Sequence, residues 1–137
     1  MKTTATIKAD RYIAHAPARV WRALTDSERM GRWLMPNTFQ PVVGHAFTLD
    51  TGNWGLTQCE VLAIEPERLL RISWRNGPLD TTITWRLEAE GDGTHLYLEH
   101  AGFDLDHPMQ KMAYEGMGGG WRGAVTDRLV ACLDEAD

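Results

Sequence analysis

Tryptophan and methionine are the residues in this sequence that most directly suggest a function. Their side chains favour binding of an apolar ligand rather than catalysis of a reaction. The 137 residues include six of each. Ligand pockets are lined mainly by apolar and aromatic groups, and methionine adapts to irregular shapes. The same side chains also fill ordinary hydrophobic cores, and that interpretation stays open for each of them. The candidates are Trp33, Met35, Phe39, Phe47, Trp54, Trp74, Trp85, Met112, Tyr114, Met117 and Trp121.

Two polar residues could add direction or proton transfer to such a pocket. His100 follows Leu96 and Leu98 by strict alternation. Its imidazole is therefore predicted to point inward, where it could donate to a ligand carbonyl or act as an acid or base. A core histidine with satisfied hydrogen bonds explains the pattern as well. Arg11 falls on the apolar face of its strand and, if inward, must meet a carboxylate or an anionic ligand, because an unpaired buried charge is costly. A bulge or a side chain that reaches back to solvent is the alternative for Arg11.

Other chemistries find little support in the sequence. The remaining histidines are dispersed, and the loop Asp104-Leu-Asp-His107 is more typical of a helix cap than of a cation site, so neither a metal nor a cofactor is predicted. The only serines, Ser27 and Ser73, lie outside any Gly-x-Ser-x-Gly motif, and the glycine run 116–120 does not follow a strand as a phosphate-binding loop does. The formal charge of −5 gives no broad attraction for nucleic acid or an anionic membrane.

The elements that must position these residues begin with a strand and two helices. Apolar residues at even spacing predict a strand over residues 4–14. Pro17 suits the first position of a helix, since the amide that proline lacks would be unpaired there, and this helix is expected to end at Thr25. Thr25 and Glu28 have the spacing of a capping box, which predicts a second short helix to about Trp33.

The region from Gly44 to Phe103 predicts five consecutive strands in an antiparallel meander. Apolar residues alternate there with polar ones, so one face of the sheet is expected to be apolar and the other wet. Turn residues recur at regular intervals. Asn76-Gly77 is the most specific of these signals, because both residues accept the positive φ of a two-residue type I′ turn.

A long amphipathic helix is predicted from His107 to Glu135, because apolar residues from Met109 onward recur at spacings of three or four. This helix should cover the sheet. The four glycines between Gly116 and Gly120 cost it roughly 3–4 kcal/mol in all relative to alanine. We therefore expect an irregular helix here whose backbone approaches the sheet or a ligand closely.

Together these elements predict an α+β fold in a single domain over residues 1–137. Its antiparallel sheet of about six strands is expected to wrap around the long C-terminal helix, with two short helices after the first strand. We expect neither a signal peptide nor a membrane-spanning segment, and the cytoplasm is the expected compartment. Cys59 and Cys132 form no Cys-x-x-Cys pair and are interpreted as two buried thiols, with one disulfide as the alternative.

Four stretches carry a resemblance to a known family: Ala16–Asp26 leading to Trp33, Pro66–Leu69 through Trp74, Gly93–Phe103, and Gly120-Trp121 through Leu129. They cover nearly the whole chain and resemble homologues of the activator of the heat-shock-protein-90 ATPase, within the START-like, polyketide-cyclase-like (SRPBCC) helix-grip superfamily. The resemblance implies a fold that holds apolar ligands between the sheet and the last helix. The glycine run before Trp121 departs from the family, in which ordinary helix formers are expected.

Three functions follow from these observations. The first is binding of a small hydrophobic or aromatic molecule between the sheet and the C-terminal helix, with the predicted lining Trp33, Phe47, Trp54, Trp74, Trp85, His100, Met112, Tyr114, Met117 and Trp121. The second is a cyclase- or dehydratase-like enzyme that uses the same cavity, with His100 and Asp50 or Glu60 moving protons. The third, implied by the resemblance, is a chaperone ATPase-activating interaction domain with an exposed apolar surface for a protein partner. A homodimer is a further expectation, whereas nucleic acid and membrane partners are not expected.

Overall fold

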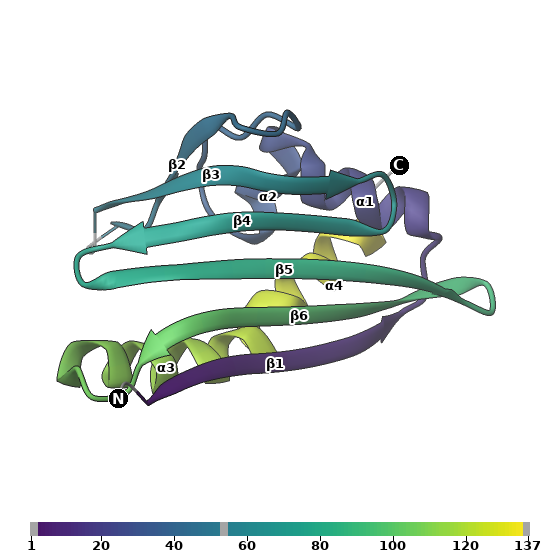
Figure 1. Cartoon of the computed structure of the whole chain (residues 1–137). Helices are drawn as coiled ribbons and strands as arrows, with labels where there is room; N and C mark the ends of the chain where they lie inside the picture. The colour runs from purple at the N-terminus through teal and green to yellow at the C-terminus, as the bar shows by residue number, and fades with distance from the viewer. Residues whose placement is uncertain (1–2, 53–54, 136–137) are drawn as a thin grey trace.

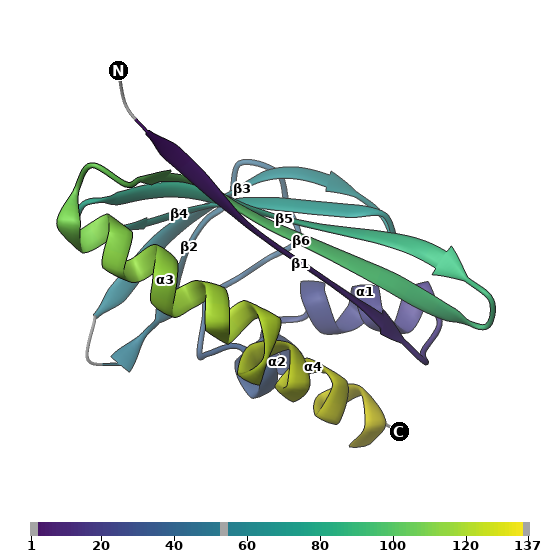
Figure 2. The same ribbon diagram turned by 90° about the horizontal axis from the view of Figure 1, so that it is seen from below.

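A six-stranded antiparallel sheet with the helices on one face makes up the computed structural model, which describes residues 3–52 and 55–135 (Figure 1, Figure 2). The strand order across the sheet is β1-β6-β5-β4-β3-β2. The elements are β1 (Thr4–Ile13), α1 (Pro17–Thr25), α2 (Ser27–Trp33), β2 (Ala46–Asp50), β3 (Leu56–Glu65), β4 (Leu69–Asn76), β5 (Leu79–Glu90), β6 (Gly93–Asp104), α3 (Pro108–Arg122) and α4 (Ala124–Glu135).

The predicted α+β helix-grip fold is confirmed by this arrangement. Five strands follow one another as a meander, and β1 adds to the end of the sheet by pairing with β6. In that register Ile7 lies opposite His100 and Arg11 opposite Leu96. On the helical face α3 packs against β1 and β6, and α4 continues from it toward α1 and α2 (Figure 2). The first and last parts of the chain are therefore neighbours in space.

The alternation of apolar and polar side chains separates the two faces of the sheet as predicted. Ile83, Trp85 and Leu87 of β5 are at most 3% exposed and face the helices. On the outer face, Arg71 of β4 donates from Nε to the Thr84 hydroxyl over 3.0 Å. The core therefore lies between the inner face of the sheet and the helical layer.

A bulge near the end of β6 changes which residues face inward. The pairing of β1 with β6 shifts register between Ala5 and Thr6, and Gly102 is the unpaired residue opposite the shift, with φ at +100°. That conformation favours glycine, which has no Cβ to clash with the backbone. Strict alternation would leave Phe103 outside, but the bulge turns it into the core, where it is fully buried beside His100.

The hairpin between β4 and β5 is shifted by one residue from the prediction. Asn76 pairs with Leu79, so the two turn residues are Gly77 and Pro78 rather than Asn76 and Gly77. A type I′ turn needs positive φ at both central residues, which the proline ring forbids. Only Gly77 has positive φ, at +56°, and Asn76 stays in the ladder with its amide donating to the Thr57 hydroxyl.

The two short helices begin and end as predicted, but the capping box is wrong. Asp26 is the cap residue of α2, and no side-chain cap bond forms there. The Thr25 hydroxyl instead donates to the carbonyl oxygen of Trp21 within α1, over 2.7 Å. Thr25 therefore closes the first helix rather than opening the second.

The long C-terminal helix is present, but its break is not where the glycine run predicts it. All four glycines from Gly116 to Gly120 lie within α3, and the helix is interrupted at Gly123 before α4 begins. A Cβ added at Gly116 or Gly119 would meet no atom within 4 Å, so the expected close approach of the backbone is wrong at these two positions. At Gly118, by contrast, a Cβ would come within 3.2 Å of Nη1 of Arg122, so the close neighbour there is a side chain of the same helix.

The two cysteines are free thiols, which excludes the alternative of a disulfide. Cys59 is buried, whereas Cys132 is half-buried. Over residues 3–52 and 55–135, none of the helices has both the length and the apolar character needed to span a bilayer.

Candidate functional site

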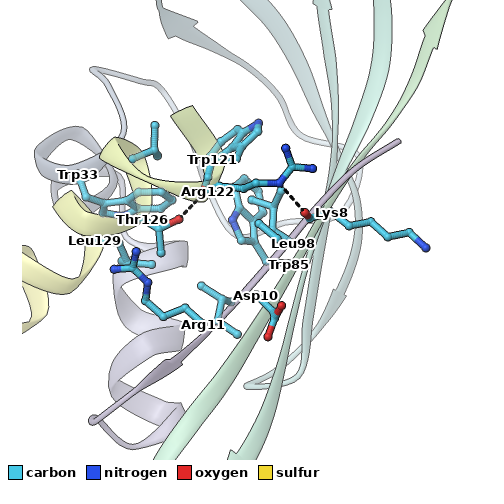
Figure 3. A pocket seen from close by; sticks show the side chains of 13 residues that line it. Lys8, Asp10, Arg11, Trp33, Trp85, Leu98, Trp121, Arg122, Thr126 and Leu129 are labelled. Carbon is cyan, nitrogen blue, oxygen red and sulfur yellow. Dashed lines mark hydrogen bonds between the residues drawn. The ribbon is translucent and has the colours of Figure 1, made fainter. Parts of the chain in front are cut away.

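A pocket of about 240 Å³ lies between the sheet and the helical layer, beside the junction of α3 and α4 (Figure 3). An engineered cavity of roughly 150 Å³ binds benzene, and pockets for drug-sized ligands measure about 300–1,000 Å³. The volume therefore suits a molecule of one or two rings. The pocket is lined by Lys8, Ala9, Asp10, Arg11, Trp33, Trp85, Leu96, Leu98, Trp121, Arg122, Val125, Thr126 and Leu129.

Three tryptophans from three different elements form the inner wall of this pocket. The indole ring of Trp85, on β5, meets Trp33 of α2 edge to face, with ring centroids 6.2 Å apart and planes at 88°. Trp85 meets Trp121 of α3 in the same way, at 6.1 Å and 82°. Each ring is at most 4% exposed. Edge-to-face pairs contribute about 0.5–1.5 kcal/mol beyond the area that they bury, so this wall is a fixed aromatic surface.

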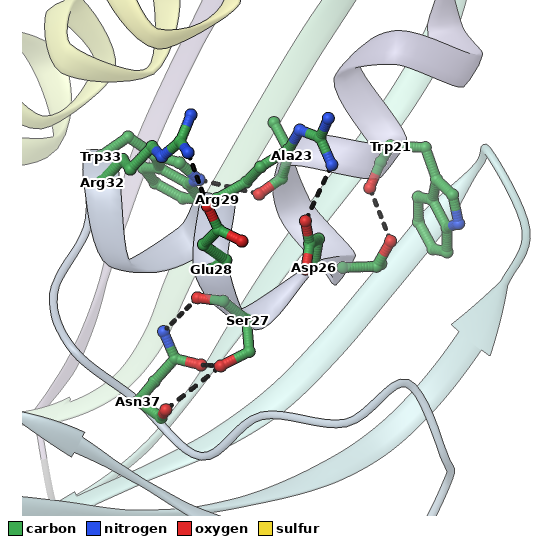
Figure 4. Close-up of polar contacts among 10 residues, drawn as sticks. Trp21, Ala23, Asp26, Ser27, Glu28, Arg29, Arg32, Trp33 and Asn37 are labelled. Atoms are coloured by element: carbon green, nitrogen blue, oxygen red, sulfur yellow. Dashed lines mark hydrogen bonds and ion pairs between the residues drawn. The ribbon is translucent and has the colours of Figure 1, made fainter.

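Trp33 is held in place by the corner between α1 and α2 (Figure 4). Its indole Nε1–H donates to the carbonyl oxygen of Ala23 over 2.8 Å. The corner itself is fastened by Ser27, whose hydroxyl donates to the Asn37 side-chain oxygen over 2.7 Å, and by an ion pair of 2.8 Å between Arg29 and Asp26. The donor of Trp33 is thus engaged, and only the apolar ring is offered to the pocket.

Trp121 is held by a buried hydrogen-bond chain that runs through His100. The indole Nε1–H of Trp121 donates to His100 Nδ1 over 3.1 Å. Because an indole can only donate, Nδ1 accepts and the ring proton is on Nε2, which donates to the Thr81 hydroxyl over 2.8 Å. Thr81 in turn donates to the carbonyl oxygen of Trp74 over 3.0 Å. All polar atoms of the imidazole are therefore satisfied.

Burial keeps this imidazole neutral. His100 is fully buried, and desolvation lowers its pKa to about 3. Its side chain faces the core between Trp74 and Phe103 and is not among the residues that line the pocket. His100 thus acts as a core residue that orients Trp121.

The indole N–H of Trp85 differs from those of its two neighbours. Trp85 is 1% exposed, yet no other residue of the described ranges accepts a hydrogen bond from its Nε1. Figure 3 shows this nitrogen on the side of the ring that faces the pocket. The nitrogen is open to the space of the pocket rather than sealed in the core, so it is a donor available to a ligand oxygen.

Two arginines connect β1 with the helices at the rim of the pocket, one from each side. Arg11 points inward from β1, as its place in the alternation predicts, and its Nη1 lies 2.7 Å from Oδ1 of Asp127 on α4. Arg122 at the end of α3 donates from Nε to the carbonyl oxygen of Lys8 over 3.3 Å. The side chain of Arg11 is 30% exposed and that of Asp127 is 65% exposed. The rim of the pocket is therefore in contact with solvent, whereas its tryptophan wall is buried.

The other residues predicted for the lining lie elsewhere. Phe47 packs edge to face on Phe39 near the far edge of the sheet, with ring centroids 5.2 Å apart. Trp74 contacts His100, and Tyr114 contacts Phe103, in the core beyond Trp121. Met117 is half-buried against the core, whereas Met112 is 64% exposed on α3. Trp54 lies outside the described residues.

The position of Met112 follows from the helical period of α3. Gln110 is buried and Met109 is exposed, because the inward face of α3 runs through Gln110, Tyr114, Met117 and Trp121. Gln110 accepts from the backbone amide of Asp104 and donates to the carbonyl oxygen of Pro78, which fixes the first turn of the helix. Met109 and Met112 therefore lie on the solvent side of α3.

Nine residues of the lining were not among the candidate site residues: Lys8, Ala9, Asp10, Leu96, Leu98, Arg122, Val125, Thr126 and Leu129. Signals for some of them are present in the sequence. Trp121, Val125 and Leu129 are spaced four apart, which places all three on one helix face. Leu96 and Leu98 belong to the alternation that leads to His100. No local pattern indicates Arg122 or Thr126, because their place at the rim depends on the helix break at Gly123.

Metal chemistry has no visible support in this arrangement. Within residues 3–52 and 55–135, no group of three or more histidine, cysteine, aspartate or glutamate side chains could hold a metal ion.

A second hollow, of about 590 Å³, lies beside Pro17 and the turn at residues 66–68, and none of the residues that line it is aromatic. The tryptophan-lined pocket is therefore the candidate site.

Comparison with known proteins places the chain in a family. The family model described as Activator of Hsp90 ATPase homolog 1-like protein matches residues 14–134. The crystal structure of protein MLL2253 from Mesorhizobium loti is 38% identical in sequence, with a TM-score of 0.86, and the match covers 97% of this chain and 99% of that one. Among curated proteins, none matches.

Two further solved structures share the fold. CalU16 from Micromonospora echinospora is 27% identical, with a TM-score of 0.76 over 98% of this chain and 88% of that one. Protein BH1534 from Bacillus halodurans is 24% identical, with a TM-score of 0.82 over 97% of this chain and 99% of that one. The sheet, the two short helices and the C-terminal helical segment are thus common to these proteins.

Proposed function

The chain belongs to the Activator of Hsp90 ATPase homolog 1-like protein family, and on that basis we propose that it binds a small hydrophobic or aromatic molecule in the tryptophan-lined pocket. The observation that carries the proposal is a space of about 240 Å³ at the edge of the core, which Trp33, Trp85 and Trp121 border from the core side. A planar apolar molecule in this space would bury its faces against the three rings and leave its edge toward the rim.

The energetics of packing support a ligand for this space. Water can enter this pocket from the rim, and apolar surface that a ligand removes from water contributes about 25 cal/mol per Å². Here the small side chain of Ala9 on β1 leaves room that a larger residue would fill. A bound molecule would restore the missing contacts and stabilise the folded chain through linkage.

The geometry supports binding more than catalysis. A cyclase- or dehydratase-like enzyme needs a positioned acid or base at the substrate. His100 lies outside the lining with both nitrogens engaged, and neither Asp50 nor Glu60 reaches the pocket. The titratable residues of the lining, Lys8, Asp10, Arg11 and Arg122, lie toward its rim.

Titration with 2-methylnaphthalene, a neutral two-ring probe, tests the proposal. The wild-type protein should show saturable binding by isothermal titration calorimetry. Ala9→Phe, which fills the pocket from β1, should lose it. Glu99→Phe is the matched control, since Glu99 is exposed on the outer face of the neighbouring strand β6 and does not line the pocket, so this variant should leave binding unchanged. A folded wild-type protein that shows no saturable binding, or equal binding by both variants, would contradict the proposal.

A further inference from the structure

We infer that the molecule bound in this pocket is an aromatic carboxylate, held by its ring against the tryptophans and by its acid group between Trp85 Nε1 and Arg11. The inference rests on the proposed function and adds a chemical class to it. It is carried by two hydrogen-bond donors that line the same pocket. The indole N–H of Trp85 has no acceptor within the described residues, and the guanidinium of Arg11 has a solvent-exposed partner that a ligand can replace.

The first donor is the indole N–H of Trp85. The indole N–H groups of the two neighbouring tryptophans both have acceptors within the protein: that of Trp33 donates to Ala23, and that of Trp121 donates to His100. The Trp85 side chain as a whole is as buried as that of Trp33, but its Nε1 opens onto the pocket and has no acceptor within the described residues. A hydrocarbon would leave this donor unsatisfied, whereas a ligand oxygen would satisfy it.

The second donor is the guanidinium of Arg11. Its position on the inner face of β1 brings a fixed positive charge to the pocket rim, and its partner Asp127 is mostly exposed to solvent. Exposed ion pairs contribute only about 0–1 kcal/mol, so a ligand carboxylate can replace Asp127 at little cost. Guanidinium and carboxylate form charge-assisted and often bidentate hydrogen bonds, which are stronger than neutral ones.

The charges around the rim agree with a single anionic group. The lining contains Lys8, Arg11 and Arg122 as cations and Asp10 as its only anion; the Lys8 ammonium points to the outer face of β1, so Arg11 and Arg122 supply the positive charge of the rim. Asp10 belongs to the outer face of β1, where its carboxylate lies 2.6 Å from Nε2 of His95. Its charge is thus engaged away from the pocket, and a monoanionic ligand would meet a net positive rim.

A matched series of three probes tests the inference: 2-naphthoate, naphthalene-2-carboxamide and 2-methylnaphthalene. They share the two-ring body and differ in charge and in the acceptor. We expect 2-naphthoate to bind the wild-type protein about tenfold more tightly than the carboxamide, because its hydrogen bonds are charge-assisted. The carboxamide should in turn bind more tightly than 2-methylnaphthalene, since its oxygen can accept from Trp85.

Substitutions assign each preference to its residue. Arg11→Met, which keeps the aliphatic stem, should remove the preference for the acid over the amide. Asp127→Asn should strengthen binding of 2-naphthoate several-fold and leave the carboxamide unchanged. Trp85→Phe should remove the preference for the carboxamide over 2-methylnaphthalene and weaken that for 2-naphthoate, which Arg11 still binds. Trp33→Phe is its control, because the Trp33 N–H is already used by Ala23, so affinities should change but the order should not.

The outcomes separate this inference from the proposed function. Equal affinity for the three probes would overturn the inference while the pocket still binds aromatic molecules. A preference for the acid that survives Arg11→Met and Trp85→Phe would also overturn it, since recognition would then come from other residues. Failure of all three probes to bind the folded protein would contradict both.

Discussion

Trp121 and His100 are joined by a hydrogen bond of 3.1 Å in which the indole nitrogen donates to Nδ1 of the imidazole. This bond links α3 to β6 and joins the pocket wall to the buried core. It requires a neutral imidazole with its proton on Nε2. The position of Trp121 in the pocket therefore depends on a residue that does not touch the pocket.

Removal of His100 should destabilise the fold and disturb the pocket. In His100→Leu, the Trp121 N–H and the Thr81 hydroxyl lose the imidazole, and leaving a buried donor unsatisfied costs about 1–3 kcal/mol. Urea denaturation should show this loss. His95→Leu serves as control, since His95 lies half-buried on the outer face and its bonds to the exposed Asp10 and Glu90 are weak contributors. Equal stability of the two variants would contradict the role assigned to His100.

Stability should fall as the pH is lowered through the weakly acidic range. Burial lowers the pKa of His100 from 6.5 to about 3, so the folded chain binds this proton less readily than the unfolded chain. The contribution of His100 is therefore fully present above pH 6.5 and is lost as the pH falls from 6.5 toward 3, by up to about 1.4 kcal/mol per pH unit. Urea denaturation between pH 4.5 and about pH 7 measures this slope.

The comparison with His100→Leu isolates this histidine. The variant should lose the part of the slope that belongs to His100. Hydrogen bonds that His95 donates to the carboxylates of Asp10 and Glu90 raise its pKa, so its contribution is present at low pH and lost as the pH rises through that raised pKa. This opposite trend is common to both proteins and cancels in the difference. An unchanged slope in His100→Leu would show that the imidazole does not titrate in this way.

The two thiols should differ in reactivity. Burial raises the pKa of Cys59 to about 12, so almost no thiolate forms at pH 8, whereas Cys132 is half-buried on α4. Because the thiolate is the nucleophile, iodoacetamide should modify Cys132 first and Cys59 only after unfolding. Peptide mass spectrometry after timed alkylation checks the order. Modification of Cys59 at the faster rate in the folded protein would contradict its burial.

Glycine substitutions should have opposite effects in α3 and in β6. Gly119→Ala places a methyl group in open space on a helix and should stabilise the protein by about 1 kcal/mol. Gly102→Ala forces an alanine to φ of +100° at the bulge and should destabilise it. Thermal melts of both variants test the signs. A loss of stability in Gly119→Ala would restore the expectation of close approach at that glycine.

Much of the fold could be predicted from periodicity, whereas its irregular points could not. Alternation in Ile83, Trp85 and Leu87 marks the inner face of β5, because each strand position has one of two sides. The bulge at Gly102 and the break at Gly123 depend on contacts between distant segments. No local sequence pattern predicts the bulge or the break. Both determine which side chains reach the core or the pocket.

The candidate site was predictable in part for the same reason. Trp33, Trp85 and Trp121 stand out as large apolar residues on inward faces, and the structure brings them together. The sequence did not distinguish them from Trp74, which packs in the core, or from Met112, which lies on the solvent side of α3. That distinction requires the relative placement of helix and sheet, and the phase of α3 is set by Gln110 rather than by Met109.

The indole N–H signals of the ¹⁵N-labelled protein test binding in the tryptophan-lined pocket most directly. They are assigned through Trp→Phe variants and followed during titration with 2-methylnaphthalene and then with 2-naphthoate. Both probes should shift the signals of Trp33, Trp85 and Trp121 saturably, and only 2-naphthoate should move the Trp85 N–H strongly downfield, because it alone supplies an acceptor. Unchanged signals for these three tryptophans, or shifts confined to Trp21 and Trp74, would contradict the account.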